Sequence, residues 1–347
     1  MLYQTKNLHG GDIYGGGVRL DFSANTNPYG TPQGVLDAIT GCLHDLHRYP
    51  DPYCRELTKA ISEFEEVSQE YILCGNGAAE LIYSYCEALK PKTAVELAPT
   101  FSEYALALER VGCKPHRYIL HQDNDFALTL DFLSYLKEAK PEAVILCNPN
   151  NPTGKVIPMD LLQQILAVCE ENQSHLFIDE CFLDLSSQGE SMKGFLKDYP
   201  CLFILKAFTK SFGLAGIRLG YCLCAGSDLQ RKMSRTVQPW NISTIAQIAG
   251  VAALKEKTFL YQTQKLIEVE RPWMKRELES LNLYTCDSCA NYLLFQGPVT
   301  LHDNLKRRGI AIRNCGNYFG LVPGWYRVAV RQHEENEELI EAISQEV

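Results

Sequence analysis

The sequence lacks a surplus of positive charge, and it lacks any long uninterrupted run of apolar residues. Its 33 lysines and arginines are outnumbered by 42 aspartates and glutamates, so the formal net charge is −9. Because binding to a phosphate backbone usually requires a basic patch or stripe, we do not expect nucleic acid as a partner. No stretch of about 18 uncharged apolar residues is present and the N-terminus shows no signal pattern, so we expect neither a membrane span nor secretion. The expected partners are small molecules.

The cysteines lack the paired spacing of a metal site. Fourteen are scattered along the chain, mostly in apolar stretches such as those around Cys74 and Cys147. A free cysteine in such a stretch behaves as a small hydrophobic residue in a reducing compartment, which predicts a cytoplasmic protein. Cys286 and Cys289 have C-x-x-C spacing, but no second pair or histidine set accompanies them. We interpret that spacing as chance and expect no metal.

The chain alternates between short apolar runs and helical patterns from about residue 71 onward. Its 347 residues, 46% of them hydrophobic, suffice for a large domain and a smaller one. Because the runs are apolar throughout, they predict an α/β fold with a mostly parallel sheet flanked by helices on both faces. The predicted strands cover 71–74, 94–97, 143–147, 176–178 and 202–205, and the predicted helices cover 78–89, 101–111 and 161–170.

The pattern changes beyond about residue 237, and no repeat or long linker marks the boundary. A long helical region reaches residue 281, and three short strands and a final helix follow it, which predicts a smaller α+β domain. The strands are expected at 292–295, 310–313 and 326–330. We therefore expect an N-terminal arm over 1–30, a large domain over 31–237 and a small C-terminal domain over 238–347.

A lysine and an arginine stand eight residues apart in the segment Phe208–Gly220, with glycines between them. The amine of Lys210 can form a Schiff base with an aldehyde, and the guanidinium of Arg218 can hold a phosphate with two N–H groups. The spacing therefore suits an aldehyde cofactor that carries a phosphate. The alternative is a surface lysine and a structural arginine beside a strand.

Three loops follow predicted strands at the sheet edge where α/β proteins bind ligands. The turn Gly75–Glu80 opens a helix, and its free amide groups suit a phosphate. The turn Asn148–Gly154 would point Asn151 inward, although a plain strand-to-helix turn is the alternative. Asp179 ends a buried strand, and its carboxylate needs a partner such as a protonated pyridine nitrogen. A helix cap or a salt bridge is the alternative for Asp179.

These features occur in the order and spacing of the aspartate aminotransferase superfamily, the pyridoxal-phosphate enzymes of fold type I, which the sequence resembles over nearly its whole length. Within that superfamily it is similar to histidinol-phosphate aminotransferases and, more closely, to threonine-phosphate decarboxylases of cobalamin synthesis. The closer match rests on the segments His9–Asp12, Leu20–Asn25, Arg48–Asp51, Gln238–Trp240, Ile312–Cys315 and Trp325–Arg331.

The resemblance implies roles around the cofactor pyridoxal 5'-phosphate. Lys210 is expected to form the Schiff base and later move protons, and Asp179 is expected to pair with the pyridinium nitrogen. Asn151 is expected to bond the phenolic oxygen, and Phe101 to stack on the ring, with Tyr104 as a second candidate. The residues expected at the cofactor's phosphate are Gly77, Ala78, Thr209 and Arg218.

The resemblance also implies a homodimer with shared active sites, in which Tyr49 reaches the neighbouring subunit's phosphate. Arg313 and Arg327 match the two arginines that hold the substrate's carboxylate and phosphate. His9 and Asn25 fall where the N-terminal arm closes over the substrate. A solvated histidine and a turn asparagine are the alternatives for these two residues.

Two positions bear on the reaction. Phe182 stands where histidinol-phosphate aminotransferases usually have a tyrosine. The decarboxylases resemble this chain in having a phenylalanine there. Ala207 stands where relatives commonly carry a hydroxyl residue for the cofactor phosphate. The sequence favours decarboxylation of O-phospho-L-threonine to (R)-1-amino-2-propanol phosphate over amino-group exchange between histidinol phosphate and 2-oxoglutarate. A catalytically silent scaffold of the same fold is a third reading, and O-phosphoserine stays open as a substrate.

Overall fold

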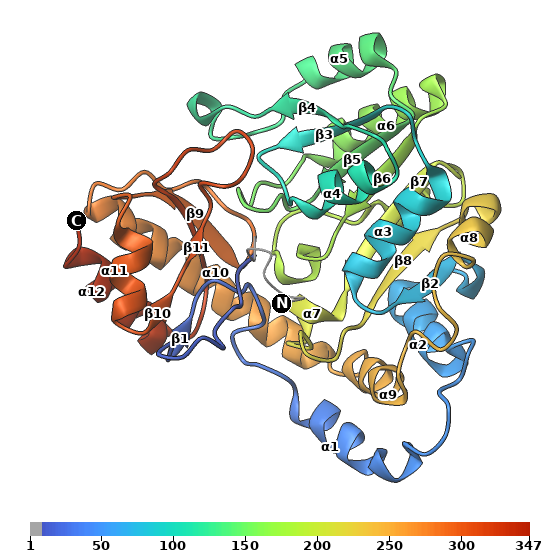
Figure 1. Ribbon diagram of the computed structural model, residues 1–347, viewed down its shortest axis with the longest axis horizontal. Helices are drawn as coiled ribbons and strands as arrows, with labels where there is room; N and C mark the ends of the chain where they lie inside the picture. The colour runs from blue at the N-terminus through green and yellow to red at the C-terminus, as the bar shows by residue number, and fades with distance from the viewer. Residues whose placement is uncertain (1–8) are drawn as a thin grey trace.

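Seven strands form the main sheet of the computed structural model, which describes residues 9–347. Their order across the sheet is β2-β8-β7-β6-β5-β3-β4 (Figure 1). Strand β8 runs antiparallel to its neighbours β2 and β7, and the other neighbouring pairs are parallel. The bounds are β2 (Ile72–Gly75), β3 (Ala94–Ala98), β4 (His116–Ile119), β5 (Ala143–Cys147), β6 (His175–Asp179), β7 (Leu202–Ala207) and β8 (Gly220–Cys224). The predicted α/β fold with a mostly parallel sheet is confirmed.

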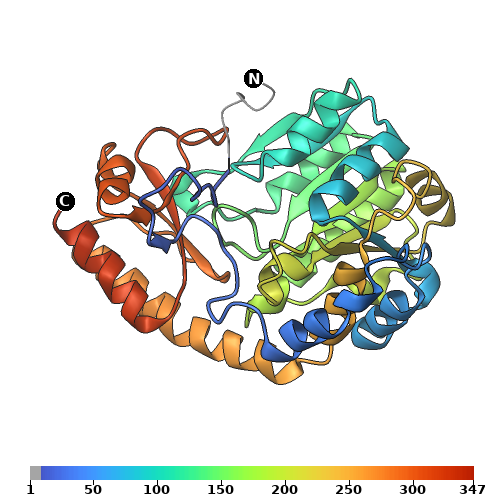
Figure 2. The ribbon, with the colours of Figure 1, turned by 60° about the horizontal axis from the view of Figure 1, so that its bottom comes forward.

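Helices cover both faces of this sheet, which explains why the central strands β5 and β7 are buried along their whole length (Figure 2). Successive side chains of a strand point to opposite faces, so Phe177 packs with α3 and α4 while Ile178 packs with α5 and α6. The helices that precede the C-terminal part are α1 (Gln33–Gly41), α2 (Arg55–Glu65), α3 (Ala78–Leu89), α4 (Glu103–Arg110), α5 (Asp131–Ala139), α6 (Met159–Asn172), α7 (Phe208–Ser211), α8 (Ser227–Met233) and α9 (Thr244–Ala253). Short 3₁₀ turns are η1 (Leu43–Asp45), η2 (Gln69–Tyr71), η3 (Gln122–Asn124), η4 (Leu183–Leu185) and η5 (Met192–Phe195).

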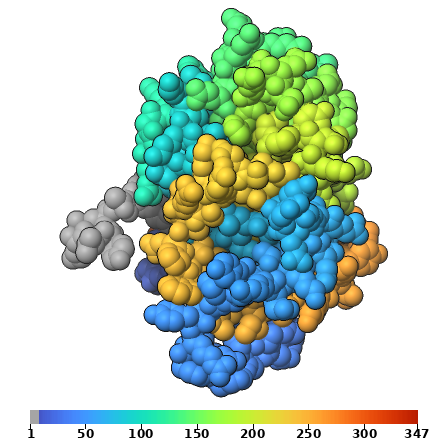
Figure 3. All heavy atoms as spheres, turned by 90° about the vertical axis from the view of Figure 1, so that its right-hand side faces the viewer, coloured from blue at the N-terminus to red at the C-terminus, as the bar shows by residue number. Residues whose placement is uncertain are grey.

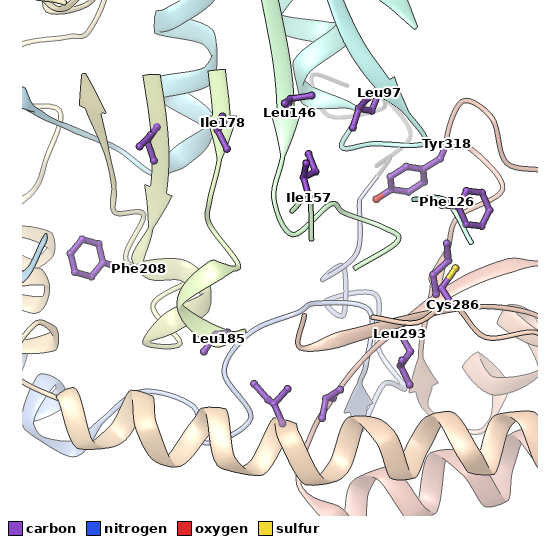
Figure 4. Close-up of a cluster of buried hydrophobic side chains, with 14 of the residues drawn as sticks. Leu97, Phe126, Leu146, Ile157, Ile178, Leu185, Phe208, Cys286, Leu293 and Tyr318 are labelled. Atoms are coloured by element: carbon purple, nitrogen blue, oxygen red, sulfur yellow. The ribbon is translucent and has the colours of Figure 1, made fainter. Parts of the chain in front are cut away.

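The C-terminal part contains a small antiparallel sheet in the order β11-β12-β9. Its strands are β9 (Tyr292–Gln296), β11 (Arg313–Asn314) and β12 (Trp325–Ala329). The N-terminal segment joins this part, because β1 (Leu20–Asp21) pairs in parallel with β10 (Ile310–Ala311). The helices of this part are α10 (Lys257–Ser280), α11 (Leu301–Arg307) and α12 (His333–Ser344). The larger core cluster is continuous between the two sheets and includes Leu146, Ile178 and Leu293 (Figure 4).

The structure differs from the sequence-based prediction in several elements, among them β1, α5, α8 and α11, which were not predicted. The strands β4 and β8 were not predicted, because β4 contains His116 and Arg117 and lies at the sheet edge, while β8 follows directly on a glycine-rich segment. The single helical region predicted up to residue 281 is divided into α9 and α10, since α9 packs on α1 whereas α10 packs on α12. The strand predicted at 310–313 is divided into β10 and β11, which pair in different sheets. Within residues 9–347, no helix has the length and apolar character needed to cross a membrane.

Candidate active site

A cavity of about 230 Å³ lies between the main sheet, the small sheet and the N-terminal segment. Its wall is formed by residues at the ends of β5, β6 and β7, at the start of α3, and on β11 and β12. The structure thus brings together side chains from positions 9 to 327 of the chain. The predicted site residues that line the cavity are His9, Asn25, Ala78, Phe101, Asn151, Asp179, Thr209, Lys210, Arg218, Arg313 and Arg327.

Lys210 lies on α7, the short helix that follows β7 directly, so its amine projects into the cavity at the end of the sheet. Burial and, after it, the nearby guanidinium of Arg327 together lower the pKa of Lys210 to about 8. The ring of Phe182 lies 5.6 Å from the amine nitrogen. A lysine with this pKa is partly neutral at physiological pH, which is the form that attacks an aldehyde.

Asp179 ends β6, and its carboxylate accepts two hydrogen bonds from uncharged donors. The N–H of Cys181 donates to Oδ1 at 2.9 Å, and the hydroxyl of Tyr104 donates to Oδ2 at 2.6 Å. Burial raises the pKa of Asp179, and these hydrogen bonds oppose that rise. Because both donors are neutral, the carboxylate suits a cationic partner such as a protonated ring nitrogen.

The contact between Tyr104 and Asp179 was not predicted from the sequence. Tyr104 was a second candidate for stacking, but its hydroxyl is committed to Asp179 and its ring meets Phe101 edge-on, at 5.6 Å and 81°. Its only sequence signal is its place three residues after Phe101, which puts both side chains on one side of the turn that opens α4. Tyr104 therefore contributes to the cavity through the carboxylate.

The start of α3 and Arg218 form a close cradle for an anion. Gly77 has a φ of +82°, and a Cβ atom at this position would lie 2.4 Å from Nη2 of Arg218. A Cβ atom at Gly220 would likewise lie 2.7 Å from the amide nitrogen of Ala78. Only glycine permits these approaches, which bring the guanidinium of Arg218 against the first amides of a helix. Gly77 thus adjoins the cavity, although its own atoms do not line it.

Arg313 and Arg327 stand directly opposite each other on β11 and β12 and are both buried. Nη2 of Arg313 donates to Oδ1 of Asn317 at 2.8 Å, and its guanidinium lies 5.1 Å from the Tyr318 ring. Nη1 of Arg327 donates to Oδ1 of Asn151 at 2.5 Å, and its Nη2 donates to the carbonyl of Ser23 at 2.8 Å. The register of the small sheet therefore places two guanidinium groups at one side of the cavity.

Buried polar groups at this side have hydrogen-bonding capacity that the described residues leave unused. Neither side-chain amide atom of Asn25 has a hydrogen-bond partner among residues 9–347, although this residue is only 1% exposed. Among the same residues, Nε of Arg327 also has no hydrogen-bond partner. Since buried polar groups are normally paired, these atoms are suited to a polar ligand in the cavity.

Two predicted residues lie at the margin of the site or outside it. Nε2 of His9 lies 2.7 Å from Oε1 of Glu103, and the His9 ring lies 5.5 Å from the Phe101 ring. Tyr49 is 80% exposed, does not line the cavity, and stacks on Trp240 at a centroid distance of 4.7 Å. Cys286 and Cys289 are free thiols outside the cavity.

Comparison with known proteins identifies the family. Residues 18–343 match the family of class I and II aminotransferases. The chain belongs to this family. It is 35% identical to the threonine-phosphate decarboxylase of Salmonella typhimurium over 328 residues, which covers 93% of this chain and 90% of the relative. It is 33% identical to the histidinol-phosphate aminotransferase of Desulfitobacterium hafniense over 340 residues, which covers 94% of this chain and 91% of the relative.

The solved structures agree with this assignment. The histidinol-phosphate aminotransferase from Clostridium acetobutylicum superposes with a TM-score of 0.88 at 28% identity, covering 94% of this chain and 98% of that one. The chain is thus an enzyme of the class I and II aminotransferase family, whose cofactor is pyridoxal phosphate. The residues present suit that cofactor, because a lysine of lowered pKa, a buried carboxylate and an anion cradle line one cavity.

Proposed function

We propose that this enzyme decarboxylates a phosphorylated amino acid, O-phospho-L-threonine, to (R)-1-amino-2-propanol phosphate and carbon dioxide in cobalamin synthesis. The observation that carries the proposal is the buried pair Arg313 and Arg327, opposite in register at one side of the cavity. Two guanidinium groups suit a substrate with two anionic groups, a carboxylate and a phosphate. The similarity to the threonine-phosphate decarboxylase of Salmonella typhimurium supports the same substrate.

Each residue of one set in the cavity would hold a different group of the cofactor. Lys210 would hold the cofactor's aldehyde carbon, Asp179 its ring nitrogen and Asn151 its phenolic oxygen. Phe101 would cover the face of the cofactor's ring. The residues that would hold the cofactor's phosphate are Gly77, Ala78, Thr209 and Arg218. When bound, pyridoxal phosphate supplies an electron sink for the charge that remains at the α carbon after a bond there breaks.

The remaining residues would orient the substrate. Arg313 and Arg327 would hold its two anionic groups, and Asn25 would use the buried amide that has no partner among the described residues. Because the guanidinium of Arg327 is fixed by Asn151 and Ser23, it would hold the carboxylate at a defined angle. The amine of Lys210 would then deliver a proton to the α carbon. His9 would close the cavity from the N-terminal arm.

We further propose a homodimer located in the cytoplasm. Tyr49 stacks on Trp240. Helix α1 packs on α9, and the blue and gold segments that contain these helices adjoin on the face shown in Figure 3. The side chain of Tyr49 remains 80% exposed although its ring stacks on Trp240. This exposed ring supports a role in the partner subunit's site. The fourteen free thiols support a reducing compartment.

The second candidate is a histidinol-phosphate-type aminotransferase that uses 2-oxoglutarate and glutamate. It is favoured by the relative from Desulfitobacterium hafniense and would use the same cofactor residues. Phe182 argues for the decarboxylase, because it lines the cavity beside Lys210 and carries no hydroxyl for the cofactor's phenolic oxygen. The variant Phe182→Tyr restores that hydroxyl with little change in volume and is therefore a matched probe of the choice.

One assay separates the candidates. The purified holoenzyme is given O-phospho-L-threonine, and carbon dioxide release is measured with and without 2-oxoglutarate. We expect release that is independent of the keto acid. Glutamate formation without carbon dioxide would favour the aminotransferase. Borohydride reduction should attach a pyridoxyl group to Lys210. Absence of that group after reduction would favour the silent scaffold.

A further inference from the structure

We propose that Glu103 and Tyr83 are positioning residues, which hold residues 9–12, here called the arm, closed over the cavity by binding His9. The three residues together are named the arm clasp. The inference deepens the proposed function and rests on it, because the arm closes the cavity in which the substrate would bind. It adds two residues, on α3 and α4, that do not themselves line the 230 Å³ cavity.

Two residues of the arm clasp, Glu103 and Tyr83, lie on helices. Oε1 of Glu103 lies 2.7 Å from Nε2 of His9, and the hydroxyl of Tyr83 donates to Oε2 of Glu103 at 2.8 Å. Both carboxylate oxygens are thus engaged. The hydrogen bond from His9 is the main reason that the pKa of Glu103 is lowered. Because Glu103 begins α4 and Tyr83 lies within α3, the carboxylate has a rigid base.

The other side of the arm is fastened to the C-terminal part. The amide of Gly11 donates to Oγ of Ser23 at 2.8 Å, and that hydroxyl donates to Oδ1 of Asp21 at 2.6 Å. At Gly10, a Cβ atom would lie 2.2 Å from the carbonyl oxygen of Ser23. The same carbonyl accepts the hydrogen bond from Arg327. The arm is therefore connected to Arg327 through Ser23 and to α4 through His9.

The arm lies between two cavities. His9, Gly10, Ser23 and Arg313 line both the 230 Å³ cavity and a neighbouring cavity of about 640 Å³. The larger cavity is also lined by His302 and Lys306 of α11. A substrate that enters from the larger cavity must pass the arm. Holding the arm in place therefore decides how well the substrate is retained.

The inference is tested on the pyridoxal-phosphate-loaded protein without substrate, by hydrogen exchange of the amides of residues 10–12. Glu103→Gln keeps the shape of the side chain but loses the charge, so these amides should exchange about tenfold faster, as expected for the loss of a charge-assisted hydrogen bond. Tyr83→Phe should accelerate exchange less. Glu109→Gln, on the exposed side of the same helix, is the control and should change nothing.

A double-variant test ties the effect to His9. His9→Ala should accelerate the same amides as much as Glu103→Gln does, and the combination should be no faster, because both remove one interaction. With O-phospho-L-threonine, Glu103→Gln should raise KM about tenfold and change kcat little. Exchange measured without substrate stands even if no carbon dioxide is released, so failure of the proposed function is distinguishable.

Three results would overturn the inference. The first is wild-type exchange rates in Glu103→Gln. The second is additive acceleration in the double variant. The third is a lowered kcat with an unchanged KM, which would place Glu103 in the chemistry itself. If Glu103→Gln does not fold, Tyr83→Phe decides alone, because it removes one hydroxyl from a half-buried ring.

Discussion

Lys206 is buried and Lys210, four residues further along the chain, is half-buried, and their surroundings have opposite effects on the pKa of the two amines. The amine of Lys206 lies 2.7 Å from Oδ1 of Asp184 and 3.0 Å from Oε1 of Glu65. Burial lowers the pKa of both lysines, but these carboxylates raise the pKa of Lys206 above its ordinary value. Lys210 faces Arg327 instead, and its pKa is lowered to about 8. Neighbouring charges therefore decide which of the two amines is partly neutral at physiological pH.

The same division applies to two adjacent acids, because neighbouring residues at a strand end point to opposite sides. Asp179 faces the cavity of Lys210. Glu180 lies on the side of Lys206 and is not exposed at all. Burial raises the pKa of Glu180 to about 7, and Lys206 opposes that rise. One side of the sheet thus lines the cavity, and the other carries paired charges.

The largest expected effect is that of Lys210→Ala on turnover. Loss of the group that moves protons should lower kcat by about 10²–10⁴-fold or more, with little change in the free energy of unfolding. Carbon dioxide release from O-phospho-L-threonine and urea unfolding measure the two quantities. Full activity in this variant would refute the role of the lysine.

Lys206→Met should have the reverse profile. It leaves the buried Glu65 and the half-buried Asp184 without their shared cation, so the free energy of unfolding should fall by about 3 kcal/mol. Urea unfolding of the holoenzyme measures the loss, and Lys206→Arg, which keeps the charge, is the control. Turnover per folded molecule should remain within a few-fold of the wild type. A stable but inactive Lys206→Met protein would contradict the comparison.

Arg327→Lys keeps the charge at the cavity but not the planar fork. A lysine cannot bond Asn151, Ser23 and a carboxylate together, so KM for O-phospho-L-threonine should rise by about 10- to 100-fold. Arg331→Lys, on the same segment but outside the cavity, should change KM little. Equal effects of the two variants would show that the site does not depend on the guanidinium of Arg327.

The smallest effect is the pH dependence of the Lys210 amine. Its proton is lost as the pH rises through about 8, so reductive methylation of the cofactor-free protein should rise with pH and level off above that value. Exposed lysines of ordinary pKa, about 10.4, should continue to rise. Mass spectrometry of the peptide that contains Lys210 measures the profile. A midpoint near 10 would mean that the amine is not desolvated.

Local patterns predicted much of the main sheet and of the site. The helix Ala78–Leu89 and the strand Ala143–Cys147 were predicted with the bounds that the structure has, because each is a long, uniform pattern between turn residues. The strands β4 and β8 were missed, because charged residues in one and a preceding glycine-rich segment in the other hide the apolar pattern. Lys210 was predicted from its eight-residue spacing to Arg218 across a glycine-rich segment, and Asp179 from its place at the end of a buried strand.

The sequence by itself determined the α/β order of elements and the residues that end each strand, since both follow from short-range patterns. Only the tertiary structure decided that Arg313 faces Arg327, that Tyr104 bonds Asp179 and that His9 meets Glu103. It also decided that Lys206 has two carboxylate partners and that Lys210 lies near Arg327. The physical reason is that a pKa and a hydrogen bond depend on distances in space, which long-range packing sets among residues far apart in the chain.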